Sequence, residues 1–136
     1  MTGDFGLLSF GDGAVTVMGW TIDYLKEDGI VLVKTSGPLT LEETRQLCKE
    51  AYSTAHSNGS HKFLADHRDQ DITLSVLEID KIPDMIKEIG VTSSDKFAIL
   101  YHGTSRKIEL LNFLRNLLQI EAIQMKIFSE PDKAIA

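Results

Sequence analysis

The residues best suited to chemistry form one run in the middle of the chain, Asp66-His67-Arg68-Asp69. They combine carboxylates, an imidazole that titrates near neutral pH and a guanidinium that binds anions. The apolar stretch at residues 62–65 precedes them, as in a buried strand that crosses the middle of a sheet. Ligands bind at the carboxyl edge of open α/β sheets. We therefore expect residues 66–69 to reach a binding site at that edge.

The same run does not have the arrangement of a catalytic site. Adjacent side chains of an extended chain point to opposite sides, so the four residues cannot all face one substrate. A loop cap at Asp66, an ion pair at Arg68 and a solvent-facing His67 would explain the run without a reaction. No nucleophile, base and orienting group can be placed together elsewhere in the sequence. We expect no catalytic residues and a protein that is not an enzyme.

The histidines and glycines predict no metal and no cofactor. The histidine positions fit no zinc motif: His56, His61, His67 and His102. His67 and His102 both follow predicted strands, but two ligands fall short of the usual three or four. Gly11 and Gly13 lack the third glycine of a dinucleotide-binding fingerprint.

The composition excludes several partners. The net charge is -6 and no run of Lys or Arg is present, which argues against nucleic acid and anionic membranes as partners. The single cysteine, Cys48, cannot form an internal disulfide and is typical of a reducing compartment. No apolar stretch has the roughly 20 residues of a membrane span, and residues 1–20 lack the pattern of a signal peptide. We expect a cytoplasmic protein.

Alternating strand and helix patterns predict one α/β domain at residues 20–136, after a loosely structured segment at residues 1–19. Such alternation favours a single mixed, mostly parallel sheet of four to five strands that starts with a β-hairpin and is flanked by helices. The predicted strands are residues 20–25, 30–35, 62–65, 96–101 and 123–128, and residues 70–74 are predicted to form a loop. The residues predicted to cap or start helices are Thr40, Ser75, Ser105 and Ser129. Gly59 should end the first helix, and Pro83 should divide the second.

The helix predicted at about residues 105–119 has an unusually wide apolar surface. Seven apolar residues cover more than half of its circumference: Ile108, Leu110, Leu111, Phe113, Leu114, Leu117 and Leu118. One face of a sheet does not need so much apolar surface. The excess indicates a second contact with a partner subunit, the N-terminal segment or an apolar ligand.

Several motifs occur in a distinctive order: residues 37–40 before the first helix, 64–68 at the end of a strand, the strand at 97–101, and 128–134 near the end. This order resembles that of the SpoIIAA-like proteins, bacterial relatives of the STAS domains of anti-sigma-factor antagonists. The resemblance covers roughly residues 20–136. It implies a mixed sheet flanked by helices, a fold shared with the CRAL-TRIO lipid-binding domains.

STAS antagonists carry a regulatory serine at the start of the helix that follows the central strand. Ser75 lies at roughly that place, but the acidic and glycine neighbours of the family motif are missing. The resemblance therefore implies Ser75 as a candidate phosphorylation site, whereas a plain helix cap explains the same residue.

Two functions follow from these observations. The first is a regulatory or binding domain that holds a lipophilic or anionic small molecule between the third helix and the sheet. Its ligand-binding residues would be Asp66, His67, Arg68, His102 and Phe113, with Arg68 as the partner of an anionic group. The alternative is an anti-sigma-antagonist-like interaction domain that forms a homodimer or binds a partner protein, with or without a phosphoserine switch.

Overall fold

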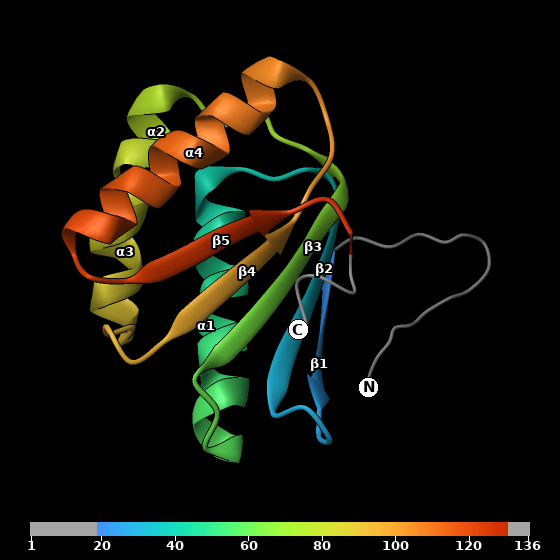
Figure 1. Ribbon diagram of the computed structural model, residues 1–136, viewed down its shortest axis with the longest axis vertical. Coiled ribbons are helices and arrows are strands. Elements are labelled where there is room, and N and C mark those ends of the chain that lie inside the picture. Colours follow the sequence, from blue (N-terminus) through green and yellow to red (C-terminus); the bar gives the residue numbers. More distant parts are fainter. Residues whose placement is uncertain (1–18, 131–136) are drawn as a thin grey trace.

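Five strands form one sheet in the order in which they follow each other along the chain (Figure 1). The computed structural model describes residues 19–130, so the predicted loose start and most of the predicted last helix lie outside the described residues. The strands are β1 (Trp20–Leu25), β2 (Ile30–Pro38), β3 (Lys62–Asp71), β4 (Lys96–Leu100) and β5 (Gln124–Phe128). The helices are α1 (Leu41–Asn58), α2 (Val76–Asp80), α3 (Ile82–Ile89) and α4 (Ser105–Ile120).

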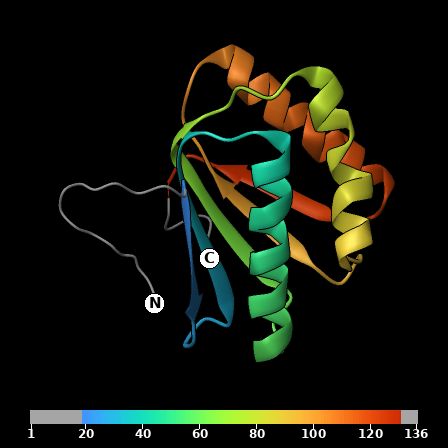
Figure 2. The same ribbon diagram turned by 180° about the vertical axis from the view of Figure 1, so that it is seen from behind.

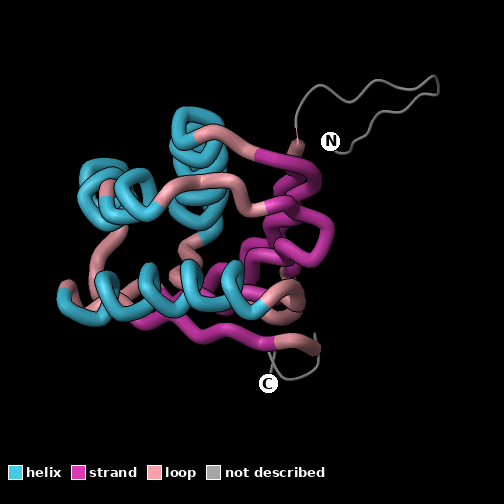
Figure 3. The backbone as a smooth tube through the Cα atoms, turned by 90° about the horizontal axis from the view of Figure 1, so that it is seen from above, coloured by secondary structure: helices cyan, strands magenta, loops and turns pink. Residues whose placement is uncertain are grey.

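The connections between the strands place the described helices on one face of the sheet. β1 and β2 are antiparallel, whereas β2, β3, β4 and β5 are parallel neighbours. Each parallel crossover leads to the next strand in the same direction, and crossovers of this kind are right-handed. Successive right-handed crossovers in one direction place their helices on the same face of the sheet, and Figure 3 shows the helices on that face. The predicted mixed, mostly parallel sheet with an N-terminal hairpin is confirmed.

The helices form two groups over that face. α1 packs against the half of the sheet made by β1, β2 and β3 (Figure 2), while α4 packs along β5. α3 lies between them and contacts both α1 and α4. The wide apolar surface of α4 is therefore used inside the domain, on β5 and on α2 and α3. Near its end, Ile120 is 80% exposed.

Most predicted helix ends are formed as the sequence suggested. Thr40 and Ser75 each form a reciprocal capping box with the glutamate three residues later, and the left-handed Gly59 ends α1. The helical region around Pro83 is divided into two, with Lys81 at the junction. The third predicted helix has Thr104 as its cap and not Ser105 as expected, because the Thr104 side chain accepts from the Lys107 amide.

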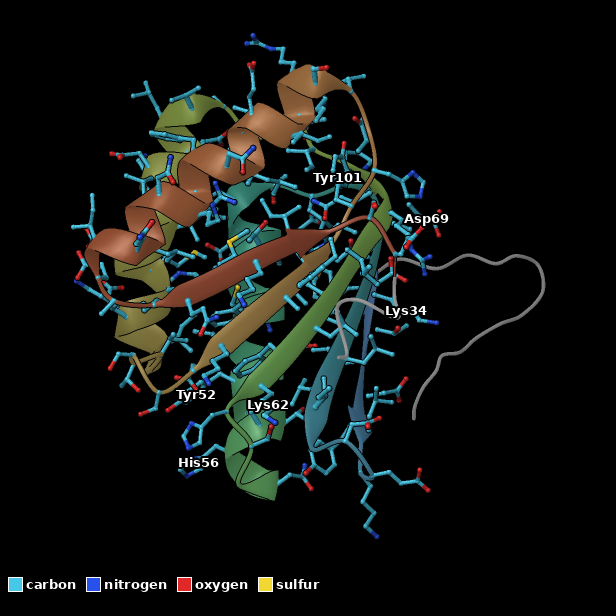
Figure 4. The ribbon with its side chains drawn as sticks, viewed as in Figure 1. Lys34, Tyr52, His56, Lys62, Asp69 and Tyr101 are labelled. Atoms are coloured by element: carbon cyan, nitrogen blue, oxygen red, sulfur yellow. The ribbon has the colours of Figure 1, made fainter. Side chains whose placement is uncertain are left out.

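β3 is in the middle of the sheet, as expected, but it is longer than its apolar stretch suggested. It runs from Lys62 to Asp71 and includes the predicted loop residues Gln70 and Asp71. Figure 4 shows Lys62 and Asp69 towards the two ends of the strand. The polar residues 66–69 were expected to follow the strand, but they are part of it, and Asp66 and Asp69 pair with β2. Polar side chains are tolerated there because this end of β3 is only partly buried.

Gly90, which ends α3, tests the packing between α3 and α1. Its φ is +128°, and a Cβ atom there would lie 2.8 Å from the hydroxyl oxygen of Tyr52. Gly59 has a φ of +66° and no atom within 4 Å of such a Cβ. We expect Gly59→Ala to cost roughly 1–2 kcal/mol through backbone strain, and Gly90→Ala about 3 kcal/mol or more because overpacking is added. Urea unfolding measures both, and equal losses would contradict the proposed clash.

Candidate functional site

A cavity of about 170 Å³ lies between the sheet and the helices. Its walls are mainly apolar and come from β2–β5 and from all four described helices. The main apolar side chains of the sheet are Val33, Phe63, Ala65, Phe97, Ile99 and Met125, and those of the helices include Leu47, Ile79, Ile82, Leu111, Leu114 and Leu118. Phe63 and Phe97 stack on each other in this wall, with ring centroids 4.9 Å apart.

A β-bulge in β3 places polar side chains at the cavity. Lys34 pairs with Asp66 and Ser36 pairs with Asp69, so the single residue Thr35 lies opposite two residues, His67 and Arg68. An extra residue in one strand shifts the alternation of its side chains. In a regular strand His67 and Gln70, three residues apart, would face opposite sides. Beyond the bulge Gln70 faces the same side as His67, and both line the cavity.

Thr35 connects the two polar side chains. It is only 3% exposed, and its Oγ1 lies 2.7 Å from Nδ1 of His67 and 2.9 Å from Oε1 of Gln70. A hydroxyl has one proton, and the amide oxygen of Gln70 can only accept it. Thr35 therefore accepts from Nδ1–H of His67, which leaves Nε2 of His67 without a proton. No hydrogen-bond partner of Nε2 occurs among residues 19–130.

The surroundings keep His67 uncharged. Its side chain is half-buried and part of its surface borders the cavity, whose wall is mainly apolar. Desolvation lowers the pKa of His67 from 6.5 to about 4, and the nearby Asp66 opposes this shift only in part. Neutral imidazole is therefore the form present at neutral pH, with one nitrogen as donor and the other as acceptor.

Cys48 of α1 also lines the cavity. Burial raises the pKa of its thiol from 9.0 to about 12. Because the thiolate is the nucleophilic form, a thiol with this pKa is inert near neutral pH. Cys48 therefore contributes apolar surface to the wall.

Asp66 and Arg68 point away from the cavity, on the face of the sheet opposite to the helices. Nε of Arg68 lies 2.8 Å from Oδ1 of Asp66, and Nη2 lies 2.7 Å from Oδ2. This bidentate pair lowers the pKa of Asp66 and raises that of Arg68. The expected common site of Asp66, His67 and Arg68 is therefore not formed, because alternation along β3 sends His67 to one face and the ion pair to the other.

The remaining candidate residues lie outside the cavity wall. His102 is exposed in the segment between β4 and α4. Phe113 packs against the core from α4, but its neighbours Leu110, Leu111 and Leu114 line the cavity. Ser75 is exposed, and its Oγ accepts from the Glu78 amide while the Glu78 carboxylate accepts from the Ser75 amide. The capping box explains why serine occupies this position.

The sequence did not single out Thr35 and Gln70 as site residues. Thr35 has the β-branched form that strands commonly contain, and Gln70 was expected in a loop. Within the described part of the chain, no three His, Cys, Asp or Glu side chains are close enough to hold a metal ion. No helix at residues 19–130 combines the length and apolar character needed to cross a membrane.

His67 predicts a specific pH dependence of stability. The unfolded chain binds a proton at His67 near pH 6.5, whereas the folded chain resists protonation down to about pH 4. The stability contribution is therefore complete above pH 6.5 and is lost as the pH falls towards 4, by up to about 3 kcal/mol. Urea unfolding of His67→Gln should show a shallower loss of stability over this range than the unmodified protein.

The exposed His102 offers a matched control for this measurement. We expect His102→Gln to follow the pH profile of the unmodified protein. Parallel profiles for His67→Gln and the unmodified protein would show that His67 is not held neutral.

Comparison with known proteins identifies the fold of this chain. No protein-family model matches the chain, and no curated protein matches it. A solved structure of an uncharacterized protein of the DUF3478 family from Shewanella loihica PV-4, described as having a SpoIIAA-like fold, is similar with a TM-score of 0.55. The two sequences are 16% identical, and the match covers 90% of this chain and 96% of that chain. The resemblance to the SpoIIAA-like proteins is thus confirmed: this chain has a SpoIIAA-like fold.

Proposed function

We propose that this protein is a non-enzymatic domain that binds a small lipophilic molecule between its sheet and its helices. The observation that carries this proposal is the cavity, which is apolar over most of its wall and has polar side chains at His67, Gln70, Thr44 and Tyr52. Small-molecule sites in proteins combine a concave apolar wall with a few polar groups that fix the orientation of the ligand. A role in regulation would follow if the bound molecule changed the surface that a partner recognises.

The titratable groups at the cavity support binding without a reaction. The thiol of Cys48 is protonated at neutral pH because its pKa is raised to about 12. His67 already uses Nδ1 to bind Thr35. The cavity thus has a hydrogen-bonding group but no activated nucleophile beside it.

The same geometry favours a lipophilic ligand over an anionic one. The guanidinium of Arg68 is paired with both carboxylate oxygens of Asp66 and lies on the other face of the sheet. Among the described residues that line the cavity, none is Lys or Arg. An anion buried there would lose its hydration without gaining a positive partner.

Filling the cavity tests this proposal. Ala65 of β3 lines the cavity, whereas Ala98 of β4, which pairs with Leu64, packs on the opposite face of the sheet. We expect Ala65→Leu to abolish the binding of benzene. Binding is measured from the NMR shifts of the methyl groups that line the cavity. Ala98→Leu should leave that binding within about twofold, because ligand binding depends on cavity space and not on added apolar surface elsewhere.

Two results would count against the proposal. One is the absence of any benzene-induced shift in the folded, unmodified protein. The other is binding that survives Ala65→Leu unchanged, because the ligand would then occupy another place.

A second candidate function, interaction with another protein, is supported by the exposed apolar residues at the start of α2. Val76 and Leu77, next to Ser75, are 48% and 76% exposed. Exposed apolar neighbours of this kind are typical of contact surfaces. If they mediate self-association, light scattering should detect a concentration-dependent dimer that Leu77→Ser weakens at least tenfold. Ile120→Ser, at the end of α4, is the control, and a monomer at every concentration would exclude self-association.

A further inference from the structure

The size and hydrogen bonding of the cavity point to a narrower class of ligand. We propose that the site takes a compact, uncharged, ring-sized molecule whose single O–H or N–H group donates to Nε2 of His67, as in phenols and indoles. This inference rests on the proposed binding function and specifies its ligand.

The volume sets the upper size of the ligand. An apolar protein cavity of roughly 150 Å³ holds one benzene molecule, whereas pockets for drug-sized ligands have roughly 300–1,000 Å³. The cavity here is about 170 Å³. It therefore has room for one aromatic ring with a small substituent and not for a lipid chain. The expectation of a lipophilic ligand is retained, at a much smaller size than the CRAL-TRIO resemblance implies.

The wall favours a flat aromatic molecule. Phe63 and Phe97 stack with an interplanar angle of 16°, and both line the cavity. The other wall residues are mostly branched aliphatic side chains of the helices, such as Leu111 and Leu114. Aromatic rings gain additional energy from edge and offset contacts with other rings, so an aromatic ligand gains more here than an aliphatic one of equal volume.

The hydrogen bonds around Thr35 determine which polar group the ligand needs. Thr35 donates to Gln70 and accepts from Nδ1–H of His67, so Nε2 of His67 is an acceptor. Nε2 has no partner among residues 19–130, so a ligand with a donor gains a hydrogen bond there that a ligand without one does not. A hydroxyl or N–H group next to the ring supplies the missing hydrogen bond. Charge on the ligand is disfavoured, because no wall residue within 19–130 carries a compensating charge.

A ligand series on the full chain tests this class at pH 7, with binding measured by NMR titration. Phenol and toluene have nearly the same shape but only phenol has a donor, while benzoate adds a charge and octanoate adds length. We expect His67→Leu to weaken the binding of phenol about tenfold, because one hydrogen bond is lost. The affinity for toluene should change less than twofold. Benzoate and octanoate should bind at least tenfold more weakly than phenol.

A direct readout on the unmodified protein keeps the test independent of how well the variant folds. The ¹⁵N signal of Nε2 of His67 should show the unprotonated nitrogen, and it should shift with phenol but not with toluene. A protonated Nε2, or equal effects of His67→Leu on phenol and toluene, would overturn the donor requirement while leaving the binding function in place. Tight binding of octanoate would overturn the size limit. Failure of all four compounds to bind would overturn the binding function itself.

Discussion

The direction in which the strands are added is the constraint on which the rest of this structure depends. β2 to β5 are parallel and each crossover leads to the next neighbour, so the order never reverses. With right-handed crossovers, all the described helices must share one face. A sheet whose order reverses has a crevice at the reversal, where ligands of many α/β proteins bind. This sheet has no such reversal, and its cavity lies instead between the sheet and the helices that cover it.

Within that frame, the bulge at His67 and Arg68 makes the cavity amphipathic. Without it, strict alternation would turn Gln70 away from the helices and Asp69 towards them. With it, Thr35 on β2 binds two side chains of β3 and fixes the orientation of the imidazole. The same alternation places Asp66 and Arg68 on the opposite face, where they form a bidentate ion pair. Polar residues adjacent in the sequence thus serve two separate surfaces.

Local signals predicted the fold well, because each depends on a few adjacent residues. The capping boxes at Thr40 and Ser75, the left-handed Gly59 and the division near Pro83 all require only short-range geometry. The regular alternation of strands and helices then limits the possible topologies to very few. The SpoIIAA-like resemblance used these same signals, so it was accurate for the fold at a level of identity too low to indicate a shared activity.

The site was less accessible to sequence reasoning because it depends on pairing between distant strands. A polar run after four mostly apolar residues resembles the end of a strand, and nothing within residues 66–71 shows that pairing with β2 continues. Thr35 becomes a site residue only when its partner on β3 is known. A cavity is equally hard to predict from the sequence, because its volume depends on how Ala65 is positioned relative to several helices. The sequence did identify His67, but for its titration rather than for its place beneath the helices.

The bulge also sets a rule for which changes in chain length this protein can accept during evolution. Loss of a single residue between Asp66 and Asp69 would remove the bulge and restore regular pairing with β2, so Asp69 and Gln70 would keep their present faces. One residue instead of two would then lie opposite Thr35 and face the helices. Relatives with the same fold but one residue fewer at this point would be expected to keep the rest of β3 as it is. Loss of a residue elsewhere in the strand would instead reverse the faces of the residues beyond it, so length variation within β3 should be confined to the bulge.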